Sequence, residues 1–139
     1  MPLTRLSTLV GIWLLSPVIY VYLGRGTNTG QAIKWVVDNA FKPEFGDRPE
    51  VPNKVLLITD GRARDPPVLK VQSTRLQEQA TVYALGIGKQ IDYVELNRIA
   101  SKPSERHVLY VDSFSFLERA SINKKPTLSS IFCDEICVK

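Results

Sequence analysis

One carboxylate in the sequence stands where a strand should end. Residues 55–58 (VLLI) form an unbroken apolar run, which Thr59, Asp60 and Gly61 end abruptly. Such a run is typical of a buried parallel strand, and open parallel sheets bind their ligands beyond the carboxyl ends of the strands. Asp60 is therefore the first candidate functional residue. The competing interpretation is an aspartate that caps the turn or helix that follows it.

A glycine-rich stretch, residues 24–30 (GRGTNTG), stands directly before a helical pattern. Thr27, Asn28 or Thr29 is expected to cap that helix. A glycine loop before a helix can hold a phosphate group. The glycine spacing is not that of G-x-G-x-x-G, however, and no Walker-type lysine follows. We therefore do not expect dinucleotide binding.

The sequence holds two cysteines, Cys133 and Cys137, and one histidine, His107. These are too few and too far apart for a zinc site. On a helix the two cysteines would face the same way, but such neighbours seldom bridge each other. In an oxidising compartment we expect each to pair elsewhere in the chain or on another chain. The alternative is two buried free thiols on a terminal helix.

The composition describes an ordinary folded domain. The chain has 139 residues, of which 44% are hydrophobic and 23% charged, and its formal net charge is +4. This length is enough for one domain with a sizeable core. The basic residues are scattered and are not interleaved with aromatic residues, so we expect no nucleic-acid partner.

Apolar runs alternate with helical patterns after residue 24. The expected strands are residues 55–58, 81–87 and 107–111, and the expected helices are residues 32–41, 66–80, 93–100 and, with an interruption at 124–126, 114–139. This alternation predicts an α/β fold with a mostly parallel sheet flanked by helices. Because His107 is predicted inside a strand and no convincing pair of nucleophile and base is present, we expect no enzyme. Phosphoryl transfer at Asp60 is the competing hypothesis.

Residues 1–23 differ in character from the remainder. One basic residue, Arg5, precedes the uncharged segment 6–24, a layout typical of a secretory signal or signal anchor. Residues 18–23 (VIYVYL) also have the β-branched and aromatic content of a strand. A membrane span is the third interpretation, because nineteen uncharged residues are barely enough to cross a bilayer. A membrane partner is expected only if this leader is an uncleaved anchor.

Five blocks in order resemble the von Willebrand factor A (VWA) domain of matrilins and fibril-associated collagens. They are G-x-T-N-T-G in 24–30, VLLITDG at 55–61, VYALGIG at 82–88, ELNRIAS at 95–101 and HVLYVDSF at 107–114. The resemblance implies a doubly wound, Rossmann-like fold and a secreted protein that binds matrix proteins such as collagens. The terminal FCDEIC, residues 132–137, is similar to the cysteine-bearing last helix of extracellular members. In those members, one cysteine usually bridges to a partner ahead of the first strand.

The same resemblance implies a metal-ion-dependent adhesion site, which holds a divalent cation, usually Mg²⁺, at the carboxyl edge of the sheet. Thr27 matches the threonine of the family's second ligand loop, and Asp60 matches the aspartate after its fourth strand. Oxygen ligands suit a hard cation, and an open position can accept a carboxylate from a partner. The metal ligands implied are therefore Thr27 and Asp60.

The sequence departs from the family pattern, because no Asp-x-Ser-x-Ser motif occurs in the 139 residues. We expect an N-terminally truncated VWA domain (residues 24–120) after a leader (1–23) and before a C-terminal helix with the cysteine pair (121–139). One hydroxyl and one carboxylate are a poor cage for Mg²⁺, so we expect its affinity to be weak or lost. A truncated isoform product without metal-dependent binding is the alternative.

The loss of the first strand also predicts an open edge beside residues 55–60. Such an edge invites self-association, which the cysteines could reinforce. The expected rescue is that residues 18–23 pair in parallel with residues 55–60. The helix after Gly30 would then be the crossover. For either version we expect low stability.

Overall fold

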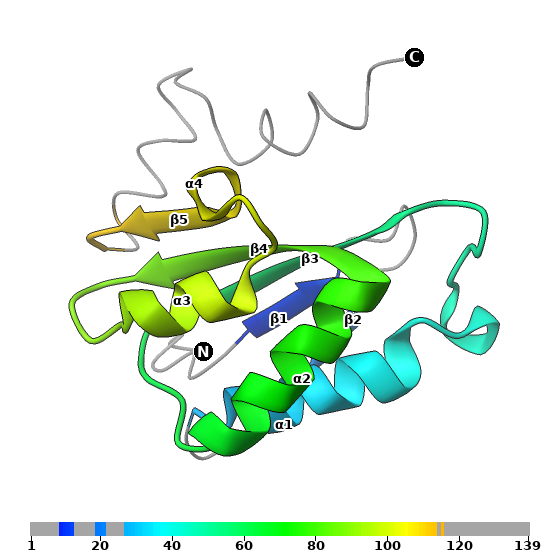
Figure 1. The fold of residues 1–139 in the computed structure, drawn as a ribbon, viewed down its shortest axis with the longest axis horizontal. Coiled ribbons are helices and arrows are strands. Elements are labelled where there is room, and N and C mark those ends of the chain that lie inside the picture. The colour runs from blue at the N-terminus through cyan, green and yellow to red at the C-terminus, as the bar shows by residue number, and fades with distance from the viewer. Residues whose placement is uncertain (1–8, 13–18, 22–26, 114, 116–139) are drawn as a thin grey trace.

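The computed structural model describes residues 9–12, 19–21, 27–113 and 115 of the 139. Within these residues, five strands form one sheet in the order β2-β1-β3-β4-β5 (Figure 1). The strands are β1 (Leu9–Ile12), β2 (Ile19–Val21), β3 (Asn53–Thr59), β4 (Ala80–Ile87) and β5 (Val108–Val111). The α-helices are α1 (Thr29–Trp35), α2 (Pro66–Gln79), α3 (Tyr93–Ile99) and α4 (Ser104–His107), and α1 continues into a π-helix, η1 (Val36–Ala40), which a 3-10 helix, η2 (Pro43–Phe45), follows. No helix in this part of the chain is long and apolar enough to cross a bilayer.

The parallel half of the sheet follows the sequence prediction. β3 pairs with β4 and β4 with β5, both in parallel, with α2 connecting the first two strands and α3 and α4 the second two. Pro66 and Pro67 open α2, where their fixed φ angles suit the first turn of a helix. The α/β fold class is confirmed.

The antiparallel half of the sheet corrects the prediction for residues 18–23. β3 does not pair with β2: its neighbour is β1, which runs antiparallel to it, and β2 pairs antiparallel with β1. β2 therefore runs in the expected direction but lies one strand further out. The reason is local, because β1 and β2 are separated by only six residues, which is too short for a parallel crossover and long enough for a hairpin. The edge of β3 that was expected to be open is covered by β1.

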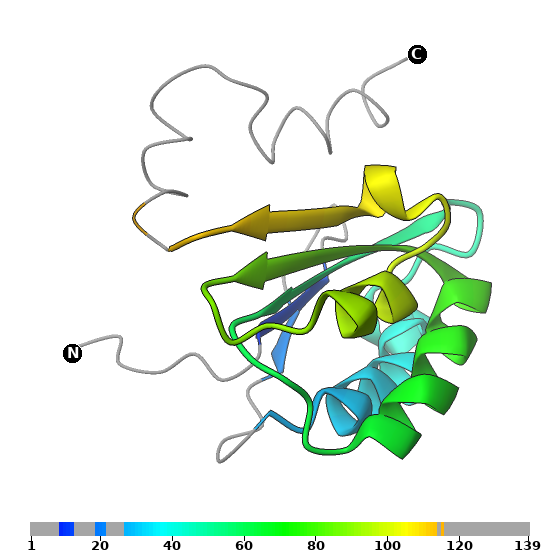
Figure 2. The same ribbon diagram turned by 60° about the vertical axis from the view of Figure 1, so that its left-hand side comes forward.

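The helices α1, α2 and α3 lie on one face of the sheet (Figure 2). Along β3 the residues alternate, so that Val55 and Leu57 are fully buried against this layer and Leu56 and Ile58 are half-buried on the other face. The run was expected to be buried throughout; the alternation of side chains between the two faces of a strand explains the difference. The core lies between the sheet and the three helices.

The boundary of β5 is also a correction. His107 was predicted inside a strand, but it is the last residue of α4. Its Nδ1 lies 2.9 Å from the carbonyl oxygen of Pro103, and its ring packs on Tyr83 at a centroid distance of 4.9 Å. The bond to Pro103 closes one helical turn, so the backbone becomes extended only at Val108. The apolar pattern of HVLYV could not locate this boundary.

Apart from residue 115, the helix expected at 114–139, and with it Cys133 and Cys137, lies outside the described residues.

Candidate functional site at the carboxyl edge of the sheet

Two loops that are distant in the sequence meet at the carboxyl end of β3. The first precedes α1 and carries Thr27, and the second follows β3 and carries Asp60 and Gly61. The Arg64 backbone N–H donates to the Thr27 carbonyl at 2.8 Å, which joins the loops. A Cβ built on Gly61 would lie 3.9 Å from the Thr27 hydroxyl oxygen. The hydroxyl of Thr27 therefore faces the turn that contains Asp60.

The side chain of Asp60 is not used to hold this turn. The Thr59 hydroxyl does so instead, because it lies 3.0 Å from the Gly61 carbonyl, to which it donates, and 3.4 Å from the Gly61 N–H. Asp60 is half-buried, and its carboxylate has no hydrogen bond or ion pair within the described part of the chain. The alternative interpretation, that Asp60 caps the following helix, is wrong: the residue at the N-cap of α2 is Asp65.

Asp65 instead completes the start of α1. Its Oδ1 accepts from the Gly30 N–H at 3.1 Å and its Oδ2 from the Gln31 N–H at 2.8 Å. The first turn of a helix leaves such N–H groups without an intrahelical partner. A cap from Thr27, Asn28 or Thr29 was expected, but Asn28 at the N-cap makes no side-chain cap bond. The N-terminal end of α1 is instead capped by the Asp65 carboxylate, from the loop before α2.

Two further carboxylates near this edge of the sheet accept hydrogen bonds from backbone N–H groups. Both Glu95 oxygens lie within hydrogen-bond distance of the Ala63 N–H, at 2.9 and 3.2 Å. Asp92 caps α3, accepting from the N–H groups of Val94 and Glu95. Burial raises the pKa of Glu95, with smaller contributions in the same direction from Asp92 and Asp65.

A depression of about 480 Å³ opens between these loops. It is lined by Thr27, Gly61, Arg62, Lys89, Gln90 and Ile91. Arg62 forms an ion pair with Asp92 at 3.6 Å, and 73% of its side chain remains exposed. The charged side chains that line the depression are thus basic.

These residues do not fit a resident Mg²⁺ ion. Mg²⁺ demands near-octahedral oxygen coordination, usually with carboxylates among its ligands. Among the described residues there is no group of three or more His, Cys, Asp or Glu side chains that could hold a metal. In addition, Arg62 and Lys89 line the depression, and like charges repel a cation.

Arg62, Lys89 and Asp65 were not predicted as site residues from the sequence. Arg62 follows the glycine after β3, and Lys89 follows Gly88, whose φ of 84° ends β4 in a left-handed turn. Since ligands of parallel sheets bind beyond the strand ends, a basic residue directly after each strand-end glycine was the signal available. For Asp65 there was no local signal, because its partners belong to another helix.

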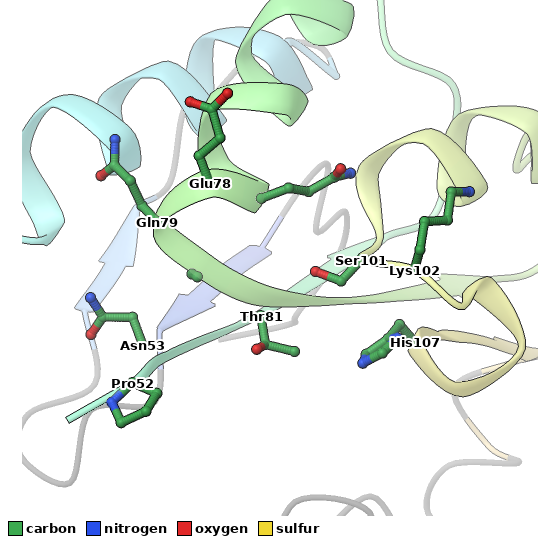
Figure 3. Close-up of a pocket in the computed structure, with 10 residues that line it drawn as sticks. Pro52, Asn53, Glu78, Gln79, Thr81, Ser101, Lys102 and His107 are labelled. Atoms are coloured by element: carbon green, nitrogen blue, oxygen red, sulfur yellow. The ribbon is translucent and has the colours of Figure 1, made fainter.

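A second depression, of about 570 Å³, lies at the opposite end of β3 and β4 (Figure 3). Pro52, Asn53, Thr81, Ser101 and His107 are among its lining residues. Several polar side chains here support the backbone: the Ser101 hydroxyl accepts from the Val82 N–H at 2.9 Å, and His107 contacts a carbonyl of its own turn. These side chains therefore stabilise the strand ends around the depression.

Comparison with known proteins agrees with this architecture. The family model of the von Willebrand factor type A domain matches residues 14–124. The chain belongs to this family. The predicted family is thereby confirmed.

The VWA domains most similar in sequence include those of matrix proteins. Matrilin-4 of Mus musculus is 40% identical over 111 residues, which are 77% of this chain and 17% of matrilin-4. The collagen alpha-1(XXI) chain of Xenopus laevis is 33% identical over 98 residues, which are 70% of this chain and 10% of the collagen chain. The chain thus spans a small part of the length of these relatives. Matrilins and collagens are secreted matrix proteins, which confirms the predicted extracellular location.

A solved structure with the same fold is proximal thread matrix protein 1 from the mussel byssus, with a zinc-occupied metal-ion-dependent adhesion site (MIDAS) motif. Its TM-score is 0.59 at 34% identity, and the match covers 66% of this chain and 23% of that protein. The relatives are structural matrix proteins rather than enzymes. The prediction that this chain has no catalytic activity stays a prediction.

Proposed function

We propose that this VWA domain is a protein-binding module of the extracellular matrix, that its partners are matrix proteins such as collagens, and that its MIDAS is incomplete. Thr27 and Asp60 are the two family ligands that remain. The affinity for Mg²⁺, or for another divalent cation such as the zinc of the byssus protein, is weak or lost.

The observation that carries this proposal is the meeting of the two loops at the carboxyl edge of the sheet. The hydrogen bond from the Arg64 N–H to the Thr27 carbonyl supports a shared edge site, as does the position of the Thr27 hydroxyl, which lies 3.9 Å from where a Cβ on Gly61 would stand. The depression between the loops gives a partner a place to bind. Its basic lining and the lack of an Asp-x-Ser-x-Ser motif support the loss of the metal.

The experiment is a binding assay of the purified chain against immobilised fibrillar collagen and matrilin, in Mg²⁺ and in a chelator. We expect saturable binding that is equally strong in both buffers. Binding only in Mg²⁺ would contradict the loss of metal dependence. No binding to any matrix protein would favour the second candidate, a truncated isoform product without adhesive function, which the missing motif supports.

Two finer proposals concern the ends of the chain. We propose that residues 1–23 are a leader or a replacement for the first strand of the family, and that Cys133 and Cys137 form disulfides with cysteines outside this pair. Mass spectrometry of the secreted protein would identify the mature N-terminus and the state of both thiols. A Cys133–Cys137 bridge would contradict the second of these proposals.

A further inference from the structure

We propose that the depression lined by Thr27, Gly61, Arg62 and Lys89 binds an acidic side chain of the partner protein directly, without a bridging metal ion. The inference rests on the proposed function and names the chemistry of its partner. In place of a cation held by carboxylates, the basic side chains of Arg62 and Lys89 supply the positive charge.

The carboxylates around the depression are already engaged. Asp65 accepts two backbone N–H groups of α1, Glu95 accepts the Ala63 N–H, and Asp92 accepts two N–H groups of α3 and pairs with Arg62. Their charges are therefore partly compensated by the backbone. The carboxylates of Asp60 and Asp112, which follow β3 and β5, accept no backbone N–H within the described residues, and Asp112 is instead hydrogen-bonded to the Tyr110 side chain.

The basic side chains, in contrast, remain available. Lys89 and the guanidinium of Arg64 are exposed and make no hydrogen bond or ion pair within the described ranges. Arg62 is held only by its 3.6 Å pair with Asp92, and its five N–H donors suit a carboxylate. Arg62 and Lys89 therefore supply the charge that lines the depression, and this charge attracts an anion.

An acidic protein segment fits this edge better than a sulfated polysaccharide. The loop that carries Lys89 continues into α3, whose first residues Tyr93 and Val94 are 51% and 67% exposed. These side chains follow Ile91, which lines the depression, by two and three residues, and they offer the exposed apolar area that protein interfaces use. A sulfated chain would use the charges but not this apolar surface.

The test measures binding of a short fluorescent oligoglutamate peptide to the full chain by anisotropy at low ionic strength, in chelator throughout. We expect Arg62→Gln and Lys89→Gln each to weaken binding roughly threefold and the double variant about tenfold, as for exposed ion pairs. Asp60→Asn removes a repulsive charge and should strengthen binding about twofold. Added salt should weaken binding to the wild-type chain.

A matched control removes the same charge elsewhere. Lys42→Gln with Arg48→Gln changes two exposed basic residues in the connection before β3, at the opposite end of the strand. This double variant should bind the peptide as the wild-type chain does. Thermal melts of all variants check that each is folded, which we expect because the side chains concerned are exposed.

Three results would overturn the inference: equal weakening by the control, loss of binding in Asp60→Asn, or binding of heparin with none of oligoglutamate. The assay on collagen and matrilin separates this inference from the proposed function. If matrix proteins bind in chelator and the Arg62/Lys89 double variant binds them equally well, the direct contact is wrong and the binding module stands. If no matrix protein binds, the proposed function fails whatever the peptide does.

Discussion

Gly30 lies in the first turn of α1 and Gly61 in the loop after β3, but only Gly61 has room for a side chain. A Cβ on Gly30 would overlap the backbone nitrogen of Leu69 and lie 2.8 Å from Asp65 Oδ2, whereas on Gly61 the nearest atom is 3.9 Å away. We expect Gly30→Ala to lower the free energy of unfolding by about 1–3 kcal/mol, because α1 and α2 must separate. Urea denaturation measures this. Gly61→Ala is the control, and an equal loss there would contradict the explanation.

Glu95 should make stability depend on pH. Because burial raises its pKa in the folded chain above the ordinary value of 4.5, the folded state binds the proton more tightly than the unfolded state. Its contribution to the free energy of unfolding is therefore full at acidic pH and is lost as the pH rises through the folded-state pKa. Glu95→Gln does not titrate, so its stability relative to the wild type should rise between about pH 4 and pH 7. Denaturation at both pH values measures this, and a fall would contradict it.

At the scale of the elements, the side chain of Gln77 in α2 bonds to the C-terminal end of α3. The Nε2 of Gln77 lies 2.7 Å from the Arg98 carbonyl, 2.9 Å from that of Ile99 and 3.1 Å from that of Ala100. These carbonyls belong to the C-terminal end of α3, where intrahelical donors run out. We expect Gln77→Ala to cost about 1–2 kcal/mol and to speed hydrogen exchange in α3. The exposed Gln79 is the control, and no difference between Gln77→Ala and Gln79→Ala would count against this role.

The elements that the sequence predicts well are those with local signals. Apolar runs predict β3 and β4, and two prolines predict the first turn of α2. Both signals depend only on residues that are close in the sequence. The pairing of β1 with β3 could not be predicted, because residues 6–24 read as one uncharged run and the choice of neighbour depends on contacts across the sheet. Among the candidate site residues, Thr27 and Asp60 came from strand ends and family motifs, while the engagement of Asp65 with α1 depends on tertiary structure alone.

At the scale of the whole molecule, the proposed loss of metal binding predicts a thermal signature. A ligand stabilises a protein by RT ln(1 + [L]/Kd), so a cation that binds weakly adds little at millimolar concentration. We expect 1 mM Mg²⁺ or Mn²⁺ to shift the Tm by less than about 1 °C, and chelator to have no effect. Differential scanning fluorimetry measures the shift. A rise of several degrees that saturates at micromolar metal would overturn the incomplete site.

The hydrogen bond between Asp65 and α1 has a consequence for folding during synthesis. Asp65 follows Gly30, whose N–H its carboxylate accepts, by 35 residues, so the first turn of α1 leaves the ribosome long before Asp65 does. In a nascent chain that ends before Asp65, the N–H groups at the start of α1 lack this acceptor and α2 is not yet present for α1 to pack on. A helix of seven residues is only marginally stable alone. The two helices should therefore become ordered together, and a peptide of residues 27–41 should show little helix in water.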